Sequence, residues 1–323
     1  MRLVTVFGGS GFLGRYVARR LAKDGLRVRV AVRRPDEAGF VRLYGHVGQV
    51  LPVFCNVRDD ASVAAALAGA EGAVNCVGTF DASGRNSFQA VHVEAPQRIA
   101  REAARAGVRR LVHVSSLGAG PGSLYGESKA EGDARVMAAF PGAVTLRPSL
   151  LFGHEDRFFN RFAAMAARGP VLPLIGASAR FQPAWVDDVA QAAALAAIRD
   201  APPGPYELGG PEALTFREMM ERMLLVIQRR RLLLPIPFWA ADAMATAFAG
   251  LAAVTGGLAP VPVTRDQVRS LRRDTVVAPG ARGFAALGIA PTALDAVLPD
   301  YLWRFRPSGQ YAAIKDSAQN LRG

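Results

Sequence analysis

Cysteine and histidine are scarce in this chain of 323 residues, which contains two cysteines and four histidines. Both cysteines lie in apolar, strand-like runs, and this placement argues against a disulfide framework and favours a reducing compartment. The histidines are scattered without the spacing of metal ligands, so the sequence predicts no metal site. The residues concerned are Cys55, Cys76, His46, His92, His113 and His154.

Acidic residues are also in deficit, with 27 aspartates and glutamates against 39 lysines and arginines and a formal net charge of +12. Such an excess favours an acidic partner, which could be a nucleic acid, an anionic lipid surface or an acidic protein. A solvated surface on an arginine-rich and alanine-rich chain is the alternative. The composition, 50% hydrophobic and 20% charged, is that of a soluble globular protein and excludes a disordered chain.

An uninterrupted apolar run of membrane-spanning character is lacking as well. The most apolar stretch, Ala243–Val263, is rich in alanine and broken by glycines and prolines, so its transfer into lipid is only weakly favourable. We expect a packed or interfacial segment there. A strand pattern begins at Arg2, so no leader peptide is expected.

The first half of the chain alternates β-rich runs with helical runs of alanine and arginine. This alternation predicts βαβ units and an α/β, doubly wound fold with a parallel sheet. The strands are near-continuous apolar runs, as expected where helices cover both sheet faces. The expected strands are Leu3–Phe7, Arg27–Val32, Val50–Cys55, Gly72–Cys76, Arg110–Ser115 and Ala143–Arg147. The expected helices are Phe12–Lys23, Ser62–Leu67, Pro96–Arg105 and Leu124–Ala139.

The pattern changes after Arg147, where prolines and glycines divide the chain into short pieces. A helical run, Asp187–Ile198, is expected to return to the sheet, and beyond Pro202 the chain is expected to be helical and then loop-rich. The sequence therefore predicts two domains. The first covers residues 1–150 with a returning segment at about 181–210, and a smaller, mostly helical domain for a partner or substrate covers 151–180 and 211–323.

A glycine-rich turn joins the first expected strand to the first expected helix, with its glycines three residues apart. The first glycine allows a tight turn, the second lets the backbone approach a pyrophosphate, and the third lets the helix pack closely on the strand. Backbone N–H groups at the helix N-terminus then face the anion. This strand–turn–helix context predicts a Rossmann-type dinucleotide-binding domain. The turn residues expected to contact the cofactor are Gly8, Ser10, Gly11, Phe12, Leu13 and Gly14.

Two arginines, Arg33 and Arg34, follow the second expected strand. They lie about twenty residues past the turn, where NAD enzymes usually present an aspartate or glutamate to the ribose hydroxyls. Guanidinium groups suit a 2′-phosphate, which a carboxylate would repel. The sequence therefore predicts NADPH as the cofactor, with at least one of the two arginines in contact with it.

The glycine spacing resembles that of the short-chain dehydrogenase/reductase superfamily in its extended or atypical branches, and so does the Tyr-x-x-x-Lys run Tyr125–Lys129. In that superfamily the lysine lowers the tyrosine pKa and holds the nicotinamide ribose, and the tyrosine is the general acid or base. The resemblance implies Ser116, Tyr125 and Lys129 as the catalytic positions, with Ser115 as the less favoured alternative for the serine. The further cofactor contacts that it implies are Asn56, Val57, Val77, Ser115, Tyr125, Lys129 and Pro148, with the Asn56 side-chain oxygen accepting from the adenine amine.

The loop before Tyr125 departs from this pattern, because only eight residues separate Ser116 from Tyr125. Typical extended reductases have far more. The 117–124 loop must be tight and rich in glycine, which leaves less room over the nicotinamide. We therefore expect these residues to hold a cofactor without turning it over.

Four further runs resemble one family more specifically, the NADPH-binding accessory subunit of respiratory complex I, an atypical short-chain dehydrogenase/reductase. These runs are Gly11–Val17, Phe152–Phe158, Gln182–Val189 and Val263–Val268. The resemblance, which extends from residue 2 to about 311, implies a tightly held NADPH, no established turnover and a place on the peripheral arm near the membrane and the quinone site. The implied partners are the complex I core subunits of the peripheral arm and membrane junction, with no nucleic acid.

The family also implies a location, which we expect to be the cytoplasmic face of a bacterial inner membrane, with the mitochondrial matrix side of the inner membrane as the alternative. Arginine clusters at Arg229–Arg231 and Arg269–Arg273 flank the apolar run Leu232–Val263, and this pairing favours attachment to an anionic membrane surface. The alternative is that the apolar run forms the core of the small domain.

Two other functions compete with the subunit hypothesis. The first is a free NADPH-dependent reductase or epimerase that acts on a small carbonyl or nucleotide-sugar substrate. The second is a nucleotide-sensing regulator, which would use the basic charge to control a partner. The specificity of the family motifs favours the subunit, because the fold alone does not fix the function.

Overall fold

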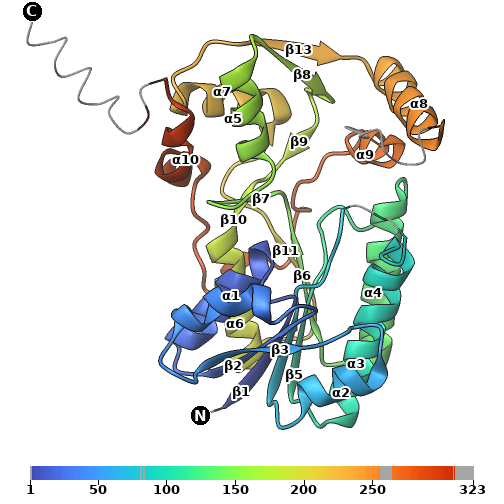
Figure 1. The fold of residues 1–323 in the computed structure, drawn as a ribbon, viewed down its shortest axis with the longest axis vertical. Coiled ribbons are helices and arrows are strands. Elements are labelled where there is room, and N and C mark those ends of the chain that lie inside the picture. The colour runs from blue at the N-terminus through green and yellow to red at the C-terminus, as the bar shows by residue number, and fades with distance from the viewer. Residues whose placement is uncertain (1, 81, 83, 255–263, 308, 310–323) are drawn as a thin grey trace, which may run out of the picture. The chain divides into compact units, whose positions relative to one another are not determined.

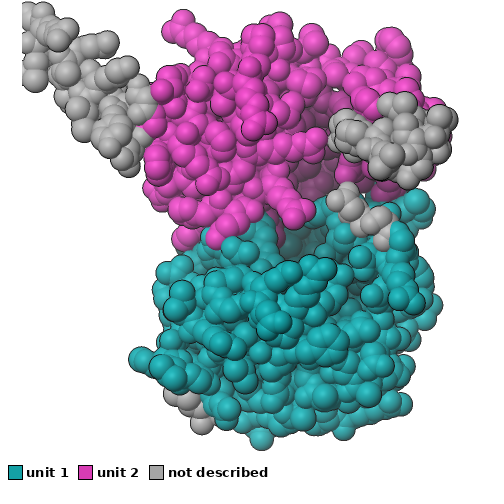
Figure 2. Space-filling view, in the orientation of Figure 1, with its two compact units in different colours: residues 1–149, 186–209, 277–291 teal, residues 150–185, 210–276, 292–323 magenta. Residues whose placement is uncertain are grey.

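The structure is a computed structural model that describes residues 2–80, 82, 84–254, 264–307 and 309 (Figure 1). The chain divides into two compact units, each built from separate stretches of sequence. Unit 1 contains residues 1–149, 186–209 and 277–291, and unit 2 contains 150–185, 210–276 and 292–323 (Figure 2). Each unit has its own buried apolar core.

A seven-stranded sheet in which every pairing is parallel forms the centre of unit 1. The strand order is β11-β6-β5-β4-β1-β2-β3, which confirms the doubly wound fold expected from the alternating pattern. Most side chains on both faces of the central strands are apolar, because helices cover both faces. The strands are β1 (Leu3–Phe7), β2 (Arg27–Val32), β3 (Val50–Phe54), β4 (Gly72–Asn75), β5 (Arg110–Val114), β6 (Val144–Pro148) and β11 (Gly204–Leu208).

Two helices, α1 (Phe12–Lys23) and α6 (Val186–Ile198), cover one face of the sheet, and α2 (Asp60–Leu67), α3 (Ala95–Arg105) and α4 (Leu124–Ala139) cover the other (Figure 1). Arg20 on α1 binds Asp187 on α6 through two hydrogen bonds of 2.8 and 2.6 Å. Helix α6 therefore returns to the sheet, as the sequence predicts. A short 3₁₀ helix, η1 (Asp36–Tyr44), follows β2, and a π-helical turn, η2 (Gln89–Glu94), leads into α3.

Strand β11 was not expected, because the run beyond Pro202 was predicted to be helical. Gly204 has a φ of 105°, which favours glycine, and Pro205 follows it inside the strand. Tyr206 is fully buried. The strand pairs only with β6, so it is an edge strand, where proline is tolerated.

Residues 277–291 also correct the sequence-based division, which placed them in the smaller domain. They belong to unit 1, where the Ala278 amide donates to the Glu207 carboxylate over 2.8 Å. The Arg282 guanidinium lies over the Tyr206 ring, 4.7 Å from its centroid. This third segment therefore packs against β11 and covers the edge of the sheet.

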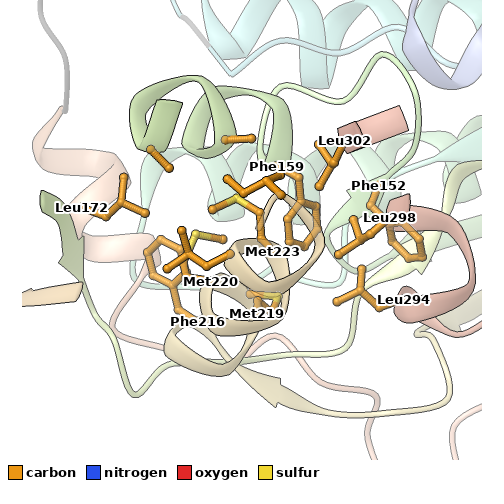
Figure 3. Close-up of a cluster of buried hydrophobic side chains, with 14 of the residues drawn as sticks. Phe152, Phe159, Leu172, Phe216, Met219, Met220, Met223, Leu294, Leu298 and Leu302 are labelled. Atoms are coloured by element: carbon orange, nitrogen blue, oxygen red, sulfur yellow. The ribbon is translucent and has the colours of Figure 1, made fainter. Parts of the chain in front are cut away.

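The core of unit 2 is built from α5 (Phe159–Arg168), α7 (Phe216–Val226) and α10 (Leu294–Leu302). Figure 3 shows the side chains that fill it, with the methionines of α7 between the phenylalanines and leucines of its neighbours. Three short strand pairs complete the unit, namely β7 (Leu151–Phe152) with β10 (Ala184–Trp185), β9 (Arg180–Phe181) with β12 (Leu214–Thr215), and β8 (Val171–Ile175) with β13 (Leu232–Ile236). The smaller unit is thus mostly helical, as expected.

The apolar run Leu232–Val263 divides into β13 and helix α8 (Phe238–Val254), and 255–263 lies outside the described residues. Trp239 on α8 is 75% exposed and Met244 is 41% exposed, while Ala241 and Ala245 are buried. One face of the described part of α8 is therefore packed and another faces solvent. In the described part of the chain, none of the helices is long and apolar enough to span a bilayer.

The arginines beside this run have mixed roles. Arg229 and Arg231 donate to the backbone carbonyls of Phe305 and Ala166 over 2.8 and 2.7 Å. Arg272 pairs with Asp242 over 2.5 Å. Part of each cluster therefore holds unit 2 together instead of standing free in solvent. A short α9 (Arg265–Ser270) contains the first arginine of the second cluster and starts with a capping box at Thr264.

Candidate functional site

The turn between β1 and α1 has the geometry of a phosphate-binding loop. Gly8 has a φ of 71°, and its amide donates to the Ala31 carbonyl over 3.0 Å. A Cβ at Gly14 would overlap the carbonyl oxygen of Gly8, so only glycine lets α1 pack this closely. Gly11 is the N-cap of α1 and supplies no side-chain cap, and no acidic residue lies in the first helical turn. The amides there are therefore available to an anion.

The other turn residues contribute through their backbones. Leu13 is buried and Ser10 is half-buried, and the Ser10 carbonyl accepts from the Arg15 guanidinium over 3.2 Å. The same guanidinium lies 4.9 Å from the centroid of the Phe40 ring. Sequence reasoning missed Arg15, although its position one turn into the helix, directly after Gly14, was a usable signal.

The two arginines after β2 differ in their surroundings. Both are exposed, but Arg34 is paired with Glu37 over 2.8 Å. Within the described part of the chain, Arg33 has neither a hydrogen bond nor an ion pair. The exposed Arg34 pair is weak, because solvent screens it. Arg33 is therefore the guanidinium more readily available to a phosphate, and Arg34 would first have to leave Glu37.

The segments after β3 and β4 carry the next predicted contacts. The side-chain oxygen of Asn56 already accepts from the Arg58 amide over 3.2 Å, and the Asn56 amide donates to Ser62 over 2.9 Å. Asn56 therefore shapes its own turn, a role that sequence reasoning did not foresee. Val57 is half-buried, and the amide of half-buried Val77 donates to the Asn75 side chain over 3.0 Å.

The predicted triad does come together at the start of α4. Ser116 hydrogen-bonds the Tyr125 phenol and also accepts from the Gly118 amide over 3.2 Å. The buried Lys129 ammonium is 3.5 Å from the Val114 carbonyl, and its nitrogen would be 3.5 Å from a Cβ placed at Gly78. Lys129 therefore faces the segment after β4, where the nicotinamide ribose is expected.

The loop between Ser116 and the triad tyrosine is closed tightly. Pro148, at the end of β6, accepts from the Leu117 amide over 2.9 Å. Ser123 caps α4 by accepting from the Gly126 amide over 3.0 Å. Ser115 is buried beside Asp133 on the other side of the backbone and does not join Ser116 and Tyr125. The structure thus separates the two serines and leaves Ser116 as the triad serine.

The protonation of the triad differs from the pattern that the family resemblance implies. Burial raises the pKa of Tyr125 to about 12; the hydrogen bond from Ser116 opposes this shift, and the charge of Asp133 adds to it. Burial lowers the pKa of Lys129 to about 8, against the attraction of Asp133. The tyrosine pKa is thus above its ordinary value, whereas a general acid or base works best near the operating pH.

Aromatic side chains surround the Tyr125 ring, and sequence reasoning missed them. Phe80 stacks on it with centroids 5.1 Å apart, and Phe88 and His92 contact it edge-on at 5.9 and 5.3 Å. The pKa of His92 is lowered to about 3, chiefly by burial, so the ring is neutral. Its Nε2 accepts from the Thr79 amide over 3.2 Å. Phe80 lies in the irregular stretch after β4, and Phe88 and His92 lie at the start of and within the π-helical turn η2, so no regular periodicity marks them.

The described residues contain no group of three or more histidine, cysteine, aspartate or glutamate side chains that could hold a metal ion. The glycine cradle, the free helix amides and the unpaired Arg33 do fit a phosphorylated dinucleotide. The residues that would hold it lie at the carboxyl ends of the parallel strands, where α/β sheets bind ligands.

Comparisons with known proteins agree with this geometry. Residues 4–209 match the NAD dependent epimerase/dehydratase family. Among solved structures, an NADPH-dependent quinone oxidoreductase from Escherichia coli with bound NADPH is similar, with a TM-score of 0.69 at 19% identity over 93% of this chain and 98% of that one. A Thermus thermophilus UDP-glucose 4-epimerase in complex with NAD gives 0.68 at 20% identity over 95% and 99%. At these identities the likeness shows the shared fold.

Relatives found by sequence identify the family more specifically than the solved structures do. The Arabidopsis thaliana mitochondrial NADH dehydrogenase (ubiquinone) 1 alpha subcomplex subunit 9 is 34% identical over 95% of this chain and 79% of the relative. The 40 kDa subunit of Neurospora crassa mitochondrial NADH-ubiquinone oxidoreductase is 29% identical over 95% and 80%. A ceramide reductase of Caulobacter vibrioides is 34% identical over 73% and 74%. The resemblance inferred from the motifs is thereby confirmed: the chain belongs to the NAD dependent epimerase/dehydratase family and, within it, to the family of the mitochondrial NADH dehydrogenase (ubiquinone) 1 alpha subcomplex subunit 9.

Proposed function

We propose that this protein is an accessory, NADPH-binding subunit of respiratory complex I, which supports its assembly and stability without turning the cofactor over. The observation that carries the proposal is the extent of the sequence match. Relatives named as subunits of the NADH:ubiquinone oxidoreductase align with 94–95% of this chain and with 79–80% of their own length. Both units are therefore included in the likeness, and not the dinucleotide-binding part alone.

The proposal of NADPH as the cofactor is supported by the residues at the carboxyl end of β2. The Gly8–Gly14 turn would bind the pyrophosphate through its amides, and Arg33, which has no partner in the described structure, would bind the 2′-phosphate. Lys129 would hold the nicotinamide ribose. Bound NADPH would supply a hydride donor, but the subunit role requires only that it stabilise the folded protein by mass action.

The absence of turnover is supported by the state of the triad tyrosine. The pKa of Tyr125 is raised to about 12, chiefly by burial, and Phe80 covers one face of its ring. A phenol with so high a pKa is a poor proton donor to a carbonyl. The short loop after Ser116 adds to this, because its glycines pack against the start of α4.

The place in the complex is supported by the charge and by α8. We propose attachment near the membrane and the quinone site, with core subunits of the peripheral arm and membrane junction as partners, on the cytoplasmic face of a bacterial inner membrane or on the matrix side in mitochondria. Exposed Trp239 and Met244 lie on an apolar helix next to arginines of unit 2. Cationic and aromatic side chains together suit an anionic lipid interface.

A second function, that of a free NADPH-dependent reductase or epimerase, is favoured by one observation. Ser116, Tyr125 and Lys129 are brought together, and a relative named ceramide reductase shares 34% identity over 73% of this chain. The Phe80–Tyr125 stack, which includes a residue 75% exposed, would then have to open for a substrate.

Fractionation of cells that contain the protein at its natural level separates the two functions. We expect it to sediment with membranes and to co-purify with complex I after mild detergent, with NADPH released on denaturation. High salt should loosen it only in part, because screening weakens charges but leaves buried apolar contacts. Recovery as free soluble protein, absent from purified complex I, together with NADPH oxidation by carbonyl compounds such as a keto derivative of ceramide, would instead establish the reductase.

A further inference from the structure

A row of buried polar side chains crosses the sheet beneath α4. Asn75, His113 and Thr145 are neighbours in register on β4, β5 and β6, so all three point to the same face of the sheet. Their exposed fractions are only 1–2%. Asp133, which is also buried, projects from α4 toward this row, with an oxygen 3.5 Å from His113 Nε2. Aliphatic side chains would normally fill such positions.

The hydrogen bonds along the row fix where its protons are. The Val77 amide donates to Asn75 Oδ1 over 3.0 Å, so the Asn75 amide nitrogen faces His113 Nδ1, 3.1 Å away. Nδ1 must accept this bond, and the proton of the neutral ring is therefore on Nε2. Burial lowers the pKa of His113, which keeps the ring neutral. His113 Nε2 lies 3.5 Å from Asp133 Oδ1.

Asp133 links this row to the triad lysine. One of its oxygens accepts a hydrogen bond of 2.9 Å from Arg147 Nε and forms an ion pair of 2.8 Å with Arg147 Nη2. Despite burial, which alone would raise it, the pKa of Asp133 is lowered by His113, Ser115 and Arg147. Lys129 precedes Asp133 by one helical turn, so both lie on one face of α4. The charge of Asp133 opposes the loss of the Lys129 proton that burial favours.

The buried polar cluster of His113, Ser115, Asp133 and Thr145 lowers the stability of the folded protein. Four of its buried atoms have no hydrogen-bond partner within the described structure: His113 Nε2, Ser115 Oγ, Asp133 Oδ1 and Thr145 Oγ1. Each such atom costs about 1–3 kcal/mol of desolvation. Stability alone would favour an apolar row here, since a buried ion pair is often no better than apolar residues of similar volume.

We propose that Asn75 and Asp133, which both lie next to His113, are positioning residues of the dinucleotide site, Asn75 by fixing the Val77 backbone and Asp133 by attracting the Lys129 ammonium one helical turn away. The inference rests on the proposed NADPH-binding function and adds residues that do not touch the cofactor. Asn75 acts by geometry, because it holds the segment that faces the ribose. Asp133 acts by charge, because it keeps the buried lysine protonated.

The sign of the pH dependence follows from the charge. Protonated Lys129 donates to ribose oxygens, so NADPH binding should weaken as the pH rises through about 8. Without the Asp133 charge this midpoint should move to lower pH, by about one unit. Binding at pH 8 would then be about fivefold weaker. The charged or titratable groups around Lys129 are Asp133 and Tyr125 on α4, Cys76 after β4, His92 on η2, His113 on β5 and Arg147 on β6.

The pKa of Lys129 can be measured directly, because the chain has only three lysines, namely Lys23, Lys129 and Lys315. In full-length protein labelled with ¹³C-lysine, a pH titration by NMR follows all three, and the Lys129→Met variant identifies the signal. We expect Asp133→Asn to lower the pKa of Lys129, and Asn75→Ala and Thr145→Val to leave it unchanged. An unchanged Lys129 pKa in Asp133→Asn overturns the role of Asp133, whether or not NADPH binds.

NADPH binding by calorimetry from pH 6 to 9.5 provides the second reading. Asp133→Asn should move the pH midpoint of binding downward. Asn75→Ala should weaken binding several-fold at every pH without moving the midpoint, and Thr145→Val, the matched control at the same depth, should bind as the unmodified protein does. Unchanged binding in Asn75→Ala overturns its positioning role. If the unmodified protein itself fails to bind NADPH, the proposed function fails, and the lysine titration still decides the coupling of Asp133 to Lys129.

Discussion

The ring of Phe80 lies almost parallel to that of Tyr125, with 5.1 Å between their centroids and 18° between their planes. A stacked pair of this kind is worth about 0.5–1.5 kcal/mol beyond the area that it buries. Phe80 is nevertheless 75% exposed, so little else of it is held in place. The stack therefore covers the phenol that the superfamily resemblance implies for proton transfer, and a modest free energy could displace this cover.

Removal of the Tyr125 hydroxyl should have little effect on respiration. We expect Tyr125→Phe to leave NADH-to-quinone electron transfer in the assembled complex almost unchanged, because the phenol pKa of about 12 leaves it a poor acid and a poor base. Lys129→Ala should do more harm, because lost NADPH no longer stabilises the fold. Electron transfer and bound NADPH in isolated membranes measure both effects. An NADPH-dependent reductase activity that Tyr125→Phe abolishes would contradict this prediction and establish the enzyme.

The nucleotide preference should depend on the two arginines after β2. The double variant Arg33→Ala, Arg34→Ala should lose most of a ten- to hundredfold preference for NADPH, since a charge-assisted contact is worth about 1.5–3 kcal/mol. Arg33→Ala alone should cost more than Arg34→Ala, because Arg34 is paired with Glu37. Dissociation constants for NADPH and NADH measure the effect, and the NADH value is the internal control. Equal dissociation constants for NADPH and NADH in the unmodified protein would contradict the assignment of the two arginines to the 2′-phosphate.

The third glycine of the turn should tolerate no side chain. Gly14→Ala places a methyl group against the Gly8 carbonyl, so unfolding should become easier by at least about 2 kcal/mol and nucleotide binding should be lost. Gly39→Ala is the matched control, because nothing lies within 4 Å of a Cβ at Gly39. Its stability should change by no more than about 0.5 kcal/mol. Denaturant titration compares the two, and similar midpoints would show that α1 can shift to make room.

A buried hydrogen bond to a carboxyl group should matter more than one to a carbonyl. The Tyr301 hydroxyl donates to the buried Asp156 carboxyl group over 2.6 Å in unit 2, so Tyr301→Phe should destabilise that unit by about 2 kcal/mol. The Tyr206 hydroxyl donates to the Pro202 carbonyl over 3.0 Å, and Tyr206→Phe should cost about 1 kcal/mol. Hydrogen exchange of each unit measures both. An equal loss in both variants would mean that the Asp156 bond has no extra strength.

Most of the sheet and its helices were predictable because their signals are periodic and local. The expected limits of β1, β2, α1 and α4 agree with those of the structure. Strand β11 was missed because Gly204 and Pro205 are residues that strands usually lack. Its extended conformation depends on pairing with β6, which the local sequence does not reveal. Helix α5 went unrecognised among breakers, although its amphipathic run packs into the unit 2 core.

The site divides in the same way. Gly8, Gly14 and Lys129 were predictable from spacing because each has a local context, a turn or one face of a helix. The contacts of Phe80 with Tyr125, and of His113 with Asp133, join residues distant in the chain, and no local pattern encodes them. The pKa of Tyr125 could not be foreseen either, because burial, which only the fold determines, dominates it.

The third segment of unit 1, residues 277–291, has a consequence for how the protein is made. Six strands of the sheet are complete once residue 148 has been synthesised, but β11 follows at 204–208 and its covering segment only at 277–291. Until β11 forms, β6 is an open edge, and from then until 277–291 follow, the open edge is β11 itself; either edge can pair with other chains. A ribosome must therefore translate most of the message before this sheet edge is covered. Translation that stops at a nonsense codon before residue 277 would release a fragment with an open sheet edge, and this fragment would aggregate instead of forming a smaller functional domain.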